Sequence, residues 1–503
     1  MAYSVYSVWH PISRAPLTVT AVLLLTALVL RSVYRARRTA HIPGLRYGSI
    51  QGIRSWVGAW HWLRDPEGVL REGCEKYPNG CFKVATLTGE NIVVNGAERL
   101  QEYLAAPDSV LNVQDAINVG IQFQWTMGPG VYHRPYHIPL VRKELSQNVG
   151  RVLPIMAEEV AGLLQKGVGE PTKWKEVAIH ELVVDMIAKV GNLALGGTPL
   201  AHNQRYIDAA IQYTMDLMLS AEILRPLPVW AKEIAVFLTP AYRSKKRCQG
   251  MVGKYIQQRL DATDSGKVER QDMLQWLIDT APAVERTMPQ LNERLLALQV
   301  AAIHTTTMTL TAAIYTLCFE PETYLEQLRD EVKQHCPDQV TKEGLDNLTK
   351  LDSYLRECGR TGPIGTLASG RYARSDFAFK DGTVIPKGYI VSGNVPMLHK
   401  MLSTEDSQFD GFRYSKLAEE GKKQPQFVST SSEYLNFGLG RQVYKNSRFF
   451  AAAEVKLILA SLLVRYDMKL IPKTKPMRLY IGSTKIPETK LKILMRSVES
   501  GTK

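Results

Sequence analysis

The sequence predicts a mainly α-helical domain with a small β region, preceded by an N-terminal transmembrane anchor. Three observations lead to this fold class. An apolar run extends from Ala15 to Leu30, apolar residues at helical spacing dominate from Ala97 to His335, and β-rich runs gather at 81–95 and 366–395. The hydrophobic content is 45% over 503 residues, which is enough for a large core.

The N-terminal apolar run lies between Arg14 and Arg31, and further arginines follow it. As a helix its residues span about 24 Å, so residues 32–34 are needed to reach across a hydrocarbon core of about 30 Å. A cleaved signal peptide carries its basic residues before the apolar run, so the order seen here favours an uncleaved anchor. The positive-inside rule then puts the rest of the chain in the cytosol. The predicted organisation is a short non-cytosolic N-terminus over 1–14, an anchor over 15–34, a basic Pro-Gly hinge over 35–46 and a folded domain over 47–503.

The formal net charge of +13 indicates an anionic partner, such as a membrane surface or an acidic protein. No zinc-finger spacing or RNA-binding signature occurs, which argues against nucleic acid. The cysteines are scattered and form no Cys-x-x-Cys pair, so neither a structural zinc site nor a disulfide framework is expected, and the pattern is typical of a reducing compartment. They are Cys74, Cys81, Cys248, Cys318, Cys336 and Cys358.

The predicted elements follow in order. A hairpin is expected over 81–95, with its turn at Thr88-Gly89-Glu90. Helical patterns then cover 97–106, 138–165 and 180–195, and a long apolar helix runs from Leu291 to Phe319. A short helix over 349–360 precedes the second β-rich region, which turns at Asp381-Gly382. The chain ends with a helix over 449–464 and strands over 468–471 and 491–496.

The middle of the long helix carries a polar island, His304 followed by three threonines. A polar island inside an apolar helix costs free energy unless its groups are bonded or line a site. Threonine hydroxyls can bond back to preceding carbonyls and bend the helix. The pattern is compatible both with a core histidine among satisfied threonines and with a proton-delivery groove beside a bound cofactor.

A glycine-rich loop, Phe437-Gly438-Leu439-Gly440-Arg441-Gln442-Val443-Tyr444, leads into the last helix. Free backbone N–H groups at such a junction suit a charged ligand. Upstream, Glu357 and Arg360 are spaced to share one helix face, although such pairs are usually surface salt bridges.

Together these segments resemble the cytochrome P450 family, in its membrane-anchored fungal secondary-metabolism type. The resemblance runs from the anchor to about Leu491 and rests on the Pro-Gly hinge, Ala-Ala-Ile-His-Thr-Thr over 301–306, Glu357-x-x-Arg360, Phe412-Arg413 and the glycine-rich loop. It implies the cytochrome P450 fold, with Glu357, Arg360 and Arg413 in a buried ion network.

The resemblance also implies a haem. Thr305 and His304 would be catalytic and relay protons, since a histidine exchanges protons near neutrality. Phe437, Gly438, Gly440 and Arg441 would hold the haem, and Arg142 and His399 would help to bind its propionates. The implied reaction is oxidation of an apolar small molecule of terpenoid or polyketide type, using O₂ and electrons from NADPH through NADPH–cytochrome P450 reductase. Membrane lipid is the other expected partner, and the endoplasmic reticulum the expected location, as a single-pass protein with its catalytic domain in the cytosol.

The centre of the loop departs from the family, whose axial haem ligand is a cysteine thiolate. Tyr444 stands at the cysteine position, Lys445 and Asn446 replace Pro-Gly, and Ser447 is one extra residue. Three interpretations follow. In the first, the sequence contains an error at an exon boundary and the protein is an ordinary monooxygenase. In the second, the protein is a family member without haem-thiolate chemistry, acting as a haem-free isomerase or cyclase or as a non-catalytic ligand-binding protein. In the third, the Tyr444 phenolate holds the haem iron, as in catalases, and Lys445 and Arg441 lower the pKa of the phenol.

Overall fold

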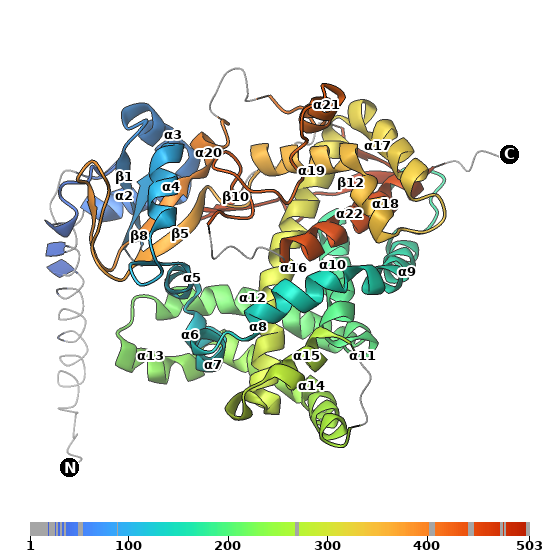
Figure 1. The fold of residues 1–503 in the computed structure, drawn as a ribbon, viewed down its shortest axis with the longest axis horizontal. Helices are drawn as coiled ribbons and strands as arrows, with labels where there is room; N and C mark the ends of the chain where they lie inside the picture. Colours follow the sequence, from blue (N-terminus) through green and yellow to red (C-terminus); the bar gives the residue numbers. More distant parts are fainter. Residues whose placement is uncertain are drawn as a thin grey trace, which may run out of the picture.

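The computed structural model describes residues 19, 26, 29–30, 33–34, 37–48, 54–87, 89–266, 271–401, 408–440, 447–472, 476 and 479–498. Helices dominate, as the sequence predicts, and the short strands form small sheets beside them (Figure 1). The predicted anchor over 15–34 falls almost wholly outside the described residues.

The strands of the fold are all seven residues or shorter. They are β1 (Cys81–Thr86), β2 (Gly89–Val94), β3 (Leu111–Asn112), β4 (Lys175–Val177), β5 (Leu367–Ala373), β6 (Phe377–Ala378), β7 (Val384–Ile385), β8 (Ile390–Asn394), β9 (Tyr466–Leu470), β10 (Leu479–Ile481), β11 (Thr484–Ile486) and β12 (Ile493–Ser497).

The helices carry most of the core. In the first half of the chain they are α2 (Arg54–Arg64), α3 (Pro66–Lys76), α4 (Ala97–Ala105), α5 (Val113–Ile121), α6 (Phe123–Thr126), α7 (Pro129–His133), α8 (His137–Leu140), the π-helical turn η1 (Val141–Leu145), α9 (Val149–Gly167), α10 (Ile179–Gly196), α11 (Thr198–Ala201), α12 (Gln204–Leu224), α13 (Val229–Ala235) and the 3₁₀ turn η2 (Val236–Leu238). In the second half they are α14 (Pro240–Asp264), α15 (Met273–Thr280), the 3₁₀ turn η3 (Ala283–Glu285), α16 (Met288–Phe319), α17 (Pro321–His335), α18 (Lys342–Asn347), α19 (Thr349–Thr361), α20 (Val395–Leu398), α21 (Arg413–Glu419) and α22 (Ser447–Arg465).

The main sheet has the strand order β1-β2-β8-β5-β3 and confirms the predicted hairpin, since β1 and β2 pair from Cys81–Val94 to Thr86–Gly89. β2 and β8 are parallel, and the other pairs are antiparallel. A second sheet, β4-β12-β9, joins the C-terminal strands to the loop before α10. The two sheets lie on either side of the helical body (Figure 1).

The described part of the predicted hinge is held against strand β1. The Lys83 backbone bonds to both Pro43 and Leu45, and the buried Lys83 ammonium donates to the Thr39 hydroxyl at 2.7 Å. Glu90 accepts hydrogen bonds from both Thr39 and Tyr47, at 3.0 Å each. These contacts fix the segment on the sheet, so it is not free to pivot.

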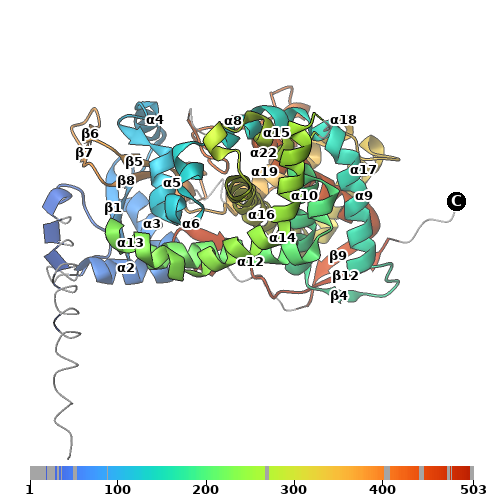
Figure 2. The same ribbon diagram turned by 90° about the horizontal axis from the view of Figure 1, so that it is seen from below.

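Helix α16 runs through the centre of the molecule and is seen nearly end-on in Figure 2. It packs against α10, α12, α14, α19 and α22, and it begins three residues before the predicted start. Among the described helices it is the one long and apolar enough to cross a membrane, yet 56% of its most apolar stretch is buried inside the domain. This burial identifies α16 as a core helix.

The predicted helical pattern over 138–165 is confirmed, with one interruption. The chain forms α8, the π-helical turn η1 and then α9, with a break at Asn148. A π-helical turn inserts an extra residue and rotates the side chains that follow it, and such turns are frequent at functional sites. Periodicity over a long apolar window does not reveal a single inserted residue, so the sequence predicted the helical pattern but not the π-helical turn.

Candidate functional site: the α16 stripe and the glycine-rich loop

Helix α16 leaves one narrow stripe uncovered along its middle. Between Leu298 and Thr316 the positions that are not buried are this stripe and the neighbouring His304. The stripe consists of Leu298, Ala301, Ala302, Thr305, Met308, Thr309, Ala312 and Thr316, at helical spacing. The helix lies at the centre of the molecule (Figure 2), and most residues of the stripe are apolar or small.

Thr305 is an exposed residue of this stripe, one turn beyond Ala301. Its hydroxyl donates to the Ala301 carbonyl oxygen at 2.8 Å, and the Thr309 hydroxyl donates to the Thr305 carbonyl oxygen at 2.8 Å. These bonds are the back-bonding that the sequence allowed, and the helix continues through the three threonines. The Thr305 hydroxyl proton is therefore held at the face of the stripe.

His304 lies close to His180 of helix α10. Burial lowers the pKa of His304, and the nearby His180 lowers it further. Among the described residues no group bonds the buried Nε2 of His304. His304 is therefore neutral near pH 7, with a ring nitrogen available for a proton or a water molecule.

The described part of the glycine-rich loop runs through Gly440. Phe437 packs edge-on against Phe427 at 5.2 Å between ring centroids. Gly438 and Gly440 both have left-handed backbones, with φ of 73° and 107°. A Cβ on Gly440 would lie 2.9 Å from Nη2 of Arg371, so this position needs glycine for both its conformation and its space. Arg441 and Tyr444 lie outside the described residues.

Arg371 of strand β5 is a site residue that the sequence did not single out. Its guanidinium is buried, and it donates to the carbonyl oxygens of Gly370 and Leu439 at 3.2 and 3.3 Å. Burial lowers its pKa, and no carboxylate among the described residues lies within ion-pair distance. The available signal was an arginine inside a β-rich run, which alone is too common to mark a site.

Arg142 is the second residue of the π-helical turn η1 and is half-buried. This turn packs against α22, the helix that follows the glycine-rich loop. The tertiary fold therefore brings the Arg142 segment next to α22, although about 300 residues separate them in sequence.

Glu357, Arg360 and Arg413 form one ion network. The Glu357 carboxylate is fully buried and lies 2.6 Å from Nη2 of Arg360 and 3.3 Å from Nε of Arg413. It also accepts the backbone N–H of Asp410 at 3.2 Å. A buried carboxylate with two guanidinium partners differs in kind from a surface pair, because removing one partner leaves a charge stranded away from water.

The sequence of the chain matches the Cytochrome P450 family over residues 132–495. It is 31% identical over 460 residues to cytochrome P450 monooxygenase 151 of Postia placenta, covering 88% of this chain and 91% of that protein. The chain belongs to the cytochrome P450 family. It is also 29% identical to ent-kaurene oxidase P450-4 of Gibberella fujikuroi, over 92% of this chain and 94% of that one. The retinoic acid-bound cyanobacterial CYP120A1 shares the fold, with a TM-score of 0.67, 20% identity and coverage of 91% and 99%.

Membership in the cytochrome P450 family implies a haem, and the described residues fit one. The α16 stripe offers an apolar wall for a flat ring, and the buried Arg371 guanidinium offers a cation for a propionate. Gly440 leaves the close approach beside Arg371 free of a side chain.

The predicted propionate role of His399 is wrong. Its Nε2 accepts the backbone N–H of Leu435 at 2.7 Å, and its Nδ1 lies 3.2 Å from the Arg360 carbonyl oxygen. The ring also stacks on Tyr434, and burial lowers its pKa to about 4. Both ring nitrogens are thus engaged, and His399 ties α19 to the segment that precedes the glycine-rich loop.

None of the six cysteines of this cytochrome P450 is prepared to act as a thiolate. All are described, and burial raises the pKa of each thiol above its ordinary value. Cys358, the nearest to the loop in sequence, packs in the core beside Tyr354 and Thr316. A nucleophilic or metal-binding cysteine requires the opposite shift.

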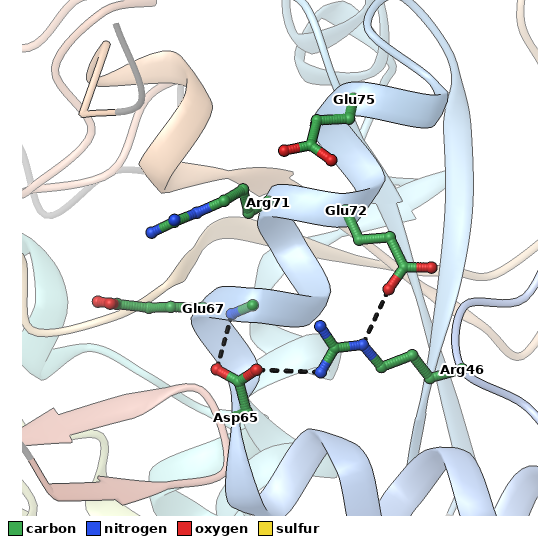
Figure 3. A pocket seen from close by; sticks show the side chains of 7 residues that line it. Arg46, Asp65, Glu67, Arg71, Glu72 and Glu75 are labelled. Atoms are coloured by element: carbon green, nitrogen blue, oxygen red, sulfur yellow. Dashed lines mark hydrogen bonds and ion pairs between the residues drawn. The ribbon is translucent and has the colours of Figure 1, made fainter. Parts of the chain in front are cut away.

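A surface hollow of about 480 Å³ lies along helix α3, far in the fold from α16 (Figures 1 and 3). Arg46 crosses it and pairs with Asp65 at 3.0 Å and Glu72 at 2.8 Å. Arg46, Asp65 and Glu72 satisfy one another, and the hollow has neither an apolar wall like the α16 stripe nor a buried cation like Arg371.

Proposed function

We propose that this cytochrome P450 is a monooxygenase of fungal secondary metabolism that oxidises an apolar small molecule of terpenoid or polyketide type. The observation that carries the proposal is the α16 stripe, a largely apolar surface in which the Thr305 hydroxyl is held near the centre by its bond to Ala301. Such a wall binds substrate by burying apolar surface, and it excludes water from the reacting carbon. The ent-kaurene oxidase among its relatives, whose name specifies a terpene hydrocarbon, supports the substrate class.

When bound, haem supplies the iron centre that activates O₂ with electrons passed from NADPH through the reductase. Thr305 and His304 are proposed to move protons beside it: the Thr305 hydroxyl turns from the Ala301 carbonyl toward the stripe, and a neutral His304 returns a proton through a water molecule. Arg371, Arg441 and Arg142 are proposed to hold the propionates. The Glu357 network keeps the segment before the loop in place.

A second candidate is a family member without haem-thiolate chemistry: a haem-free isomerase or cyclase, or a non-catalytic ligand-binding protein. Tyr444 and the absence of a thiolate-ready cysteine favour it. Iron ligation by the Tyr444 phenolate is the remaining interpretation.

The first experiment sequences the transcript over residues 430–455 and then records the carbon monoxide difference spectrum of the reduced, purified protein. A Cys codon together with a thiolate-type Soret band would identify an ordinary monooxygenase and remove the loss-of-ligand candidate. With Tyr444 in the transcript, we expect a haem band without the thiolate signature, and Tyr444→Phe to shift it if the phenolate is the ligand. The absence of any haem band would overturn the monooxygenase proposal.

We also propose that the domain lies on a membrane, with the residues of the predicted anchor 15–34 inserted and the basic surface facing an acidic reductase and anionic lipid. Large apolar side chains on α2 and α13 support this, because both helices lie along one edge of the molecule (Figure 2). Trp56, Trp60, Trp230 and Ile234 are each about half exposed or more. Tryptophan is enriched at membrane–water interfaces.

The membrane proposal predicts the behaviour of variants in vesicle flotation. A soluble form starting at residue 37 should float with vesicles containing anionic lipid, and Trp230→Ser with Ile234→Ser should reduce the floating fraction severalfold. Leu87→Ser removes another half-exposed apolar side chain, outside α2 and α13, and serves as the control. Equal losses in both variants would contradict the proposal.

A further inference from the structure

Strand β5 carries a bulge at Ser369 and Gly370. β5 pairs with β8 at Ala368–Gly393, and the pairing resumes at Arg371–Val391. Between these pairs β5 advances three residues while β8 advances two, so β5 contains one extra residue. Ser369 has a left-handed backbone with φ of 55°. A non-glycine residue holds this conformation at a cost of about 1 kcal/mol or more, and persists in it where its surroundings require it.

The side chains on either side of this bulge hold one residue of the glycine-rich loop from both ends. The Ser369 hydroxyl oxygen accepts the backbone N–H of Leu439 at 3.0 Å, and Nη2 of Arg371 donates to the Leu439 carbonyl oxygen at 3.3 Å. From the other side, the buried Tyr103 of α4 donates its hydroxyl to the Ser369 carbonyl oxygen at 3.2 Å. The chain of contacts therefore runs from a rigid helix through the bulge to the loop.

Leu439 stands between Gly438 and Gly440, the two left-handed glycines of the loop. A segment with two glycines has wide backbone freedom, so its course must be set by contacts from outside it. The two bonds to Leu439 are such contacts. Position 444 follows five residues after Leu439 in the sequence (444 − 439).

We propose that Ser369 is a positioning residue that sets the path of the glycine-rich loop at Leu439. Its left-handed backbone is kept because it aims the hydroxyl oxygen at the Leu439 amide. The hydrogen bonds from Ser369 and Arg371 to Leu439 involve protein groups alone and no cofactor. Their consequence for the geometry of a bound haem rests on the proposed function.

The test measures hydrogen exchange of the Leu439 amide in the full chain. Ser369→Ala removes the acceptor and keeps the strained backbone, whereas Ser369→Gly removes the acceptor and relieves the strain. One hydrogen bond is worth about 1 kcal/mol, so exchange should accelerate about fivefold in both variants. Ser369→Asn should restore part of the protection, because asparagine tolerates a left-handed backbone and its side-chain oxygen accepts.

The glycine variant is the decisive one. If Ser369 merely tolerates the bulge, the Leu439 amide in Ser369→Gly should be at least as well protected from exchange as in the wild type. Unchanged exchange of this amide in either the alanine or the glycine variant would overturn the proposal. Urea unfolding of the same variants checks that they are folded. Where the protein takes up haem, the Soret maximum should shift in the alanine and glycine variants and return in the asparagine variant. Failure to bind haem would count against the proposed function. The exchange rate of the Leu439 amide would still test whether Ser369 positions the loop.

Discussion

Replacing Glu357 with glutamine should cost about 3–5 kcal/mol of unfolding free energy, the range for breaking a buried ion pair from one side. The amide keeps the shape of the carboxylate and removes its charge. Arg360, 6% exposed, and Arg413 would then lie beside a neutral group in place of their carboxylate partner. Urea unfolding followed by circular dichroism measures the difference.

The matched control is Glu176→Gln, which breaks the pair with Lys492 at 3.3 Å. Both of those side chains are more than half exposed, and a surface pair contributes less than about 1 kcal/mol. If the two variants lose the same stability, the buried network does not hold the fold as argued. A partial test of the geometry is Arg360→Lys, which keeps the charge but loses the two-point contact at 2.6 and 2.8 Å.

Glu454 should make the protein less stable as the pH rises, which is the opposite of the usual carboxylate effect. It lies in α22, fully buried, facing helix α10, where an added Cβ on Gly191 would lie 3.5 Å from its Oε1. No described group bonds that oxygen. Burial raises the pKa of Glu454 to about 8.

The sign of the effect follows from the proton balance. Between its ordinary pKa of about 4.3 and about 8, the unfolded chain releases the Glu454 proton while the folded chain keeps it, so stability is full below this window and falls across it by up to about 5 kcal/mol. Glu454→Gln removes this titration. The variant should match or exceed the wild type at pH 9 and lose its advantage near pH 5, as measured by urea unfolding at each pH. A constant difference between the two proteins across the range would contradict the assignment.

Much of the secondary structure was readable because it depends on local patterns. The hairpin over 81–95 has alternating β-branched residues around a Gly turn, and the helices at 97–105, 288–319 and 447–465 have clear apolar spacing. The helical pattern over 138–165 was also readable, whereas the inserted residue in η1 and the interruption at Asn148 were not, because averaging over a window conceals them.

The candidate site was readable only in part. Thr305 could be placed on a face of α16 by periodicity, and Gly438 and Gly440 by the need for backbone freedom. The sequence alone could not distinguish the roles of His399 and Arg371, since both are basic residues in or next to β-rich runs. Their partners decide the roles: His399 has both ring nitrogens engaged by backbone, whereas the buried Arg371 guanidinium donates to backbone carbonyls and, among the described residues, has only the more distant Asp108 carboxylate acting on it.

The sequence by itself determined the family, the helical class and the unusual Tyr444, because motif order and spacing are properties of the chain. Only the tertiary structure decided that Glu357-x-x-Arg360 is a buried network and not one of the common surface pairs, since burial depends on segments far apart in sequence such as 408–413. The same reason applies to Ser369. Its contact with Leu439 joins residues 70 positions apart, and no local pattern encodes a distance of that kind.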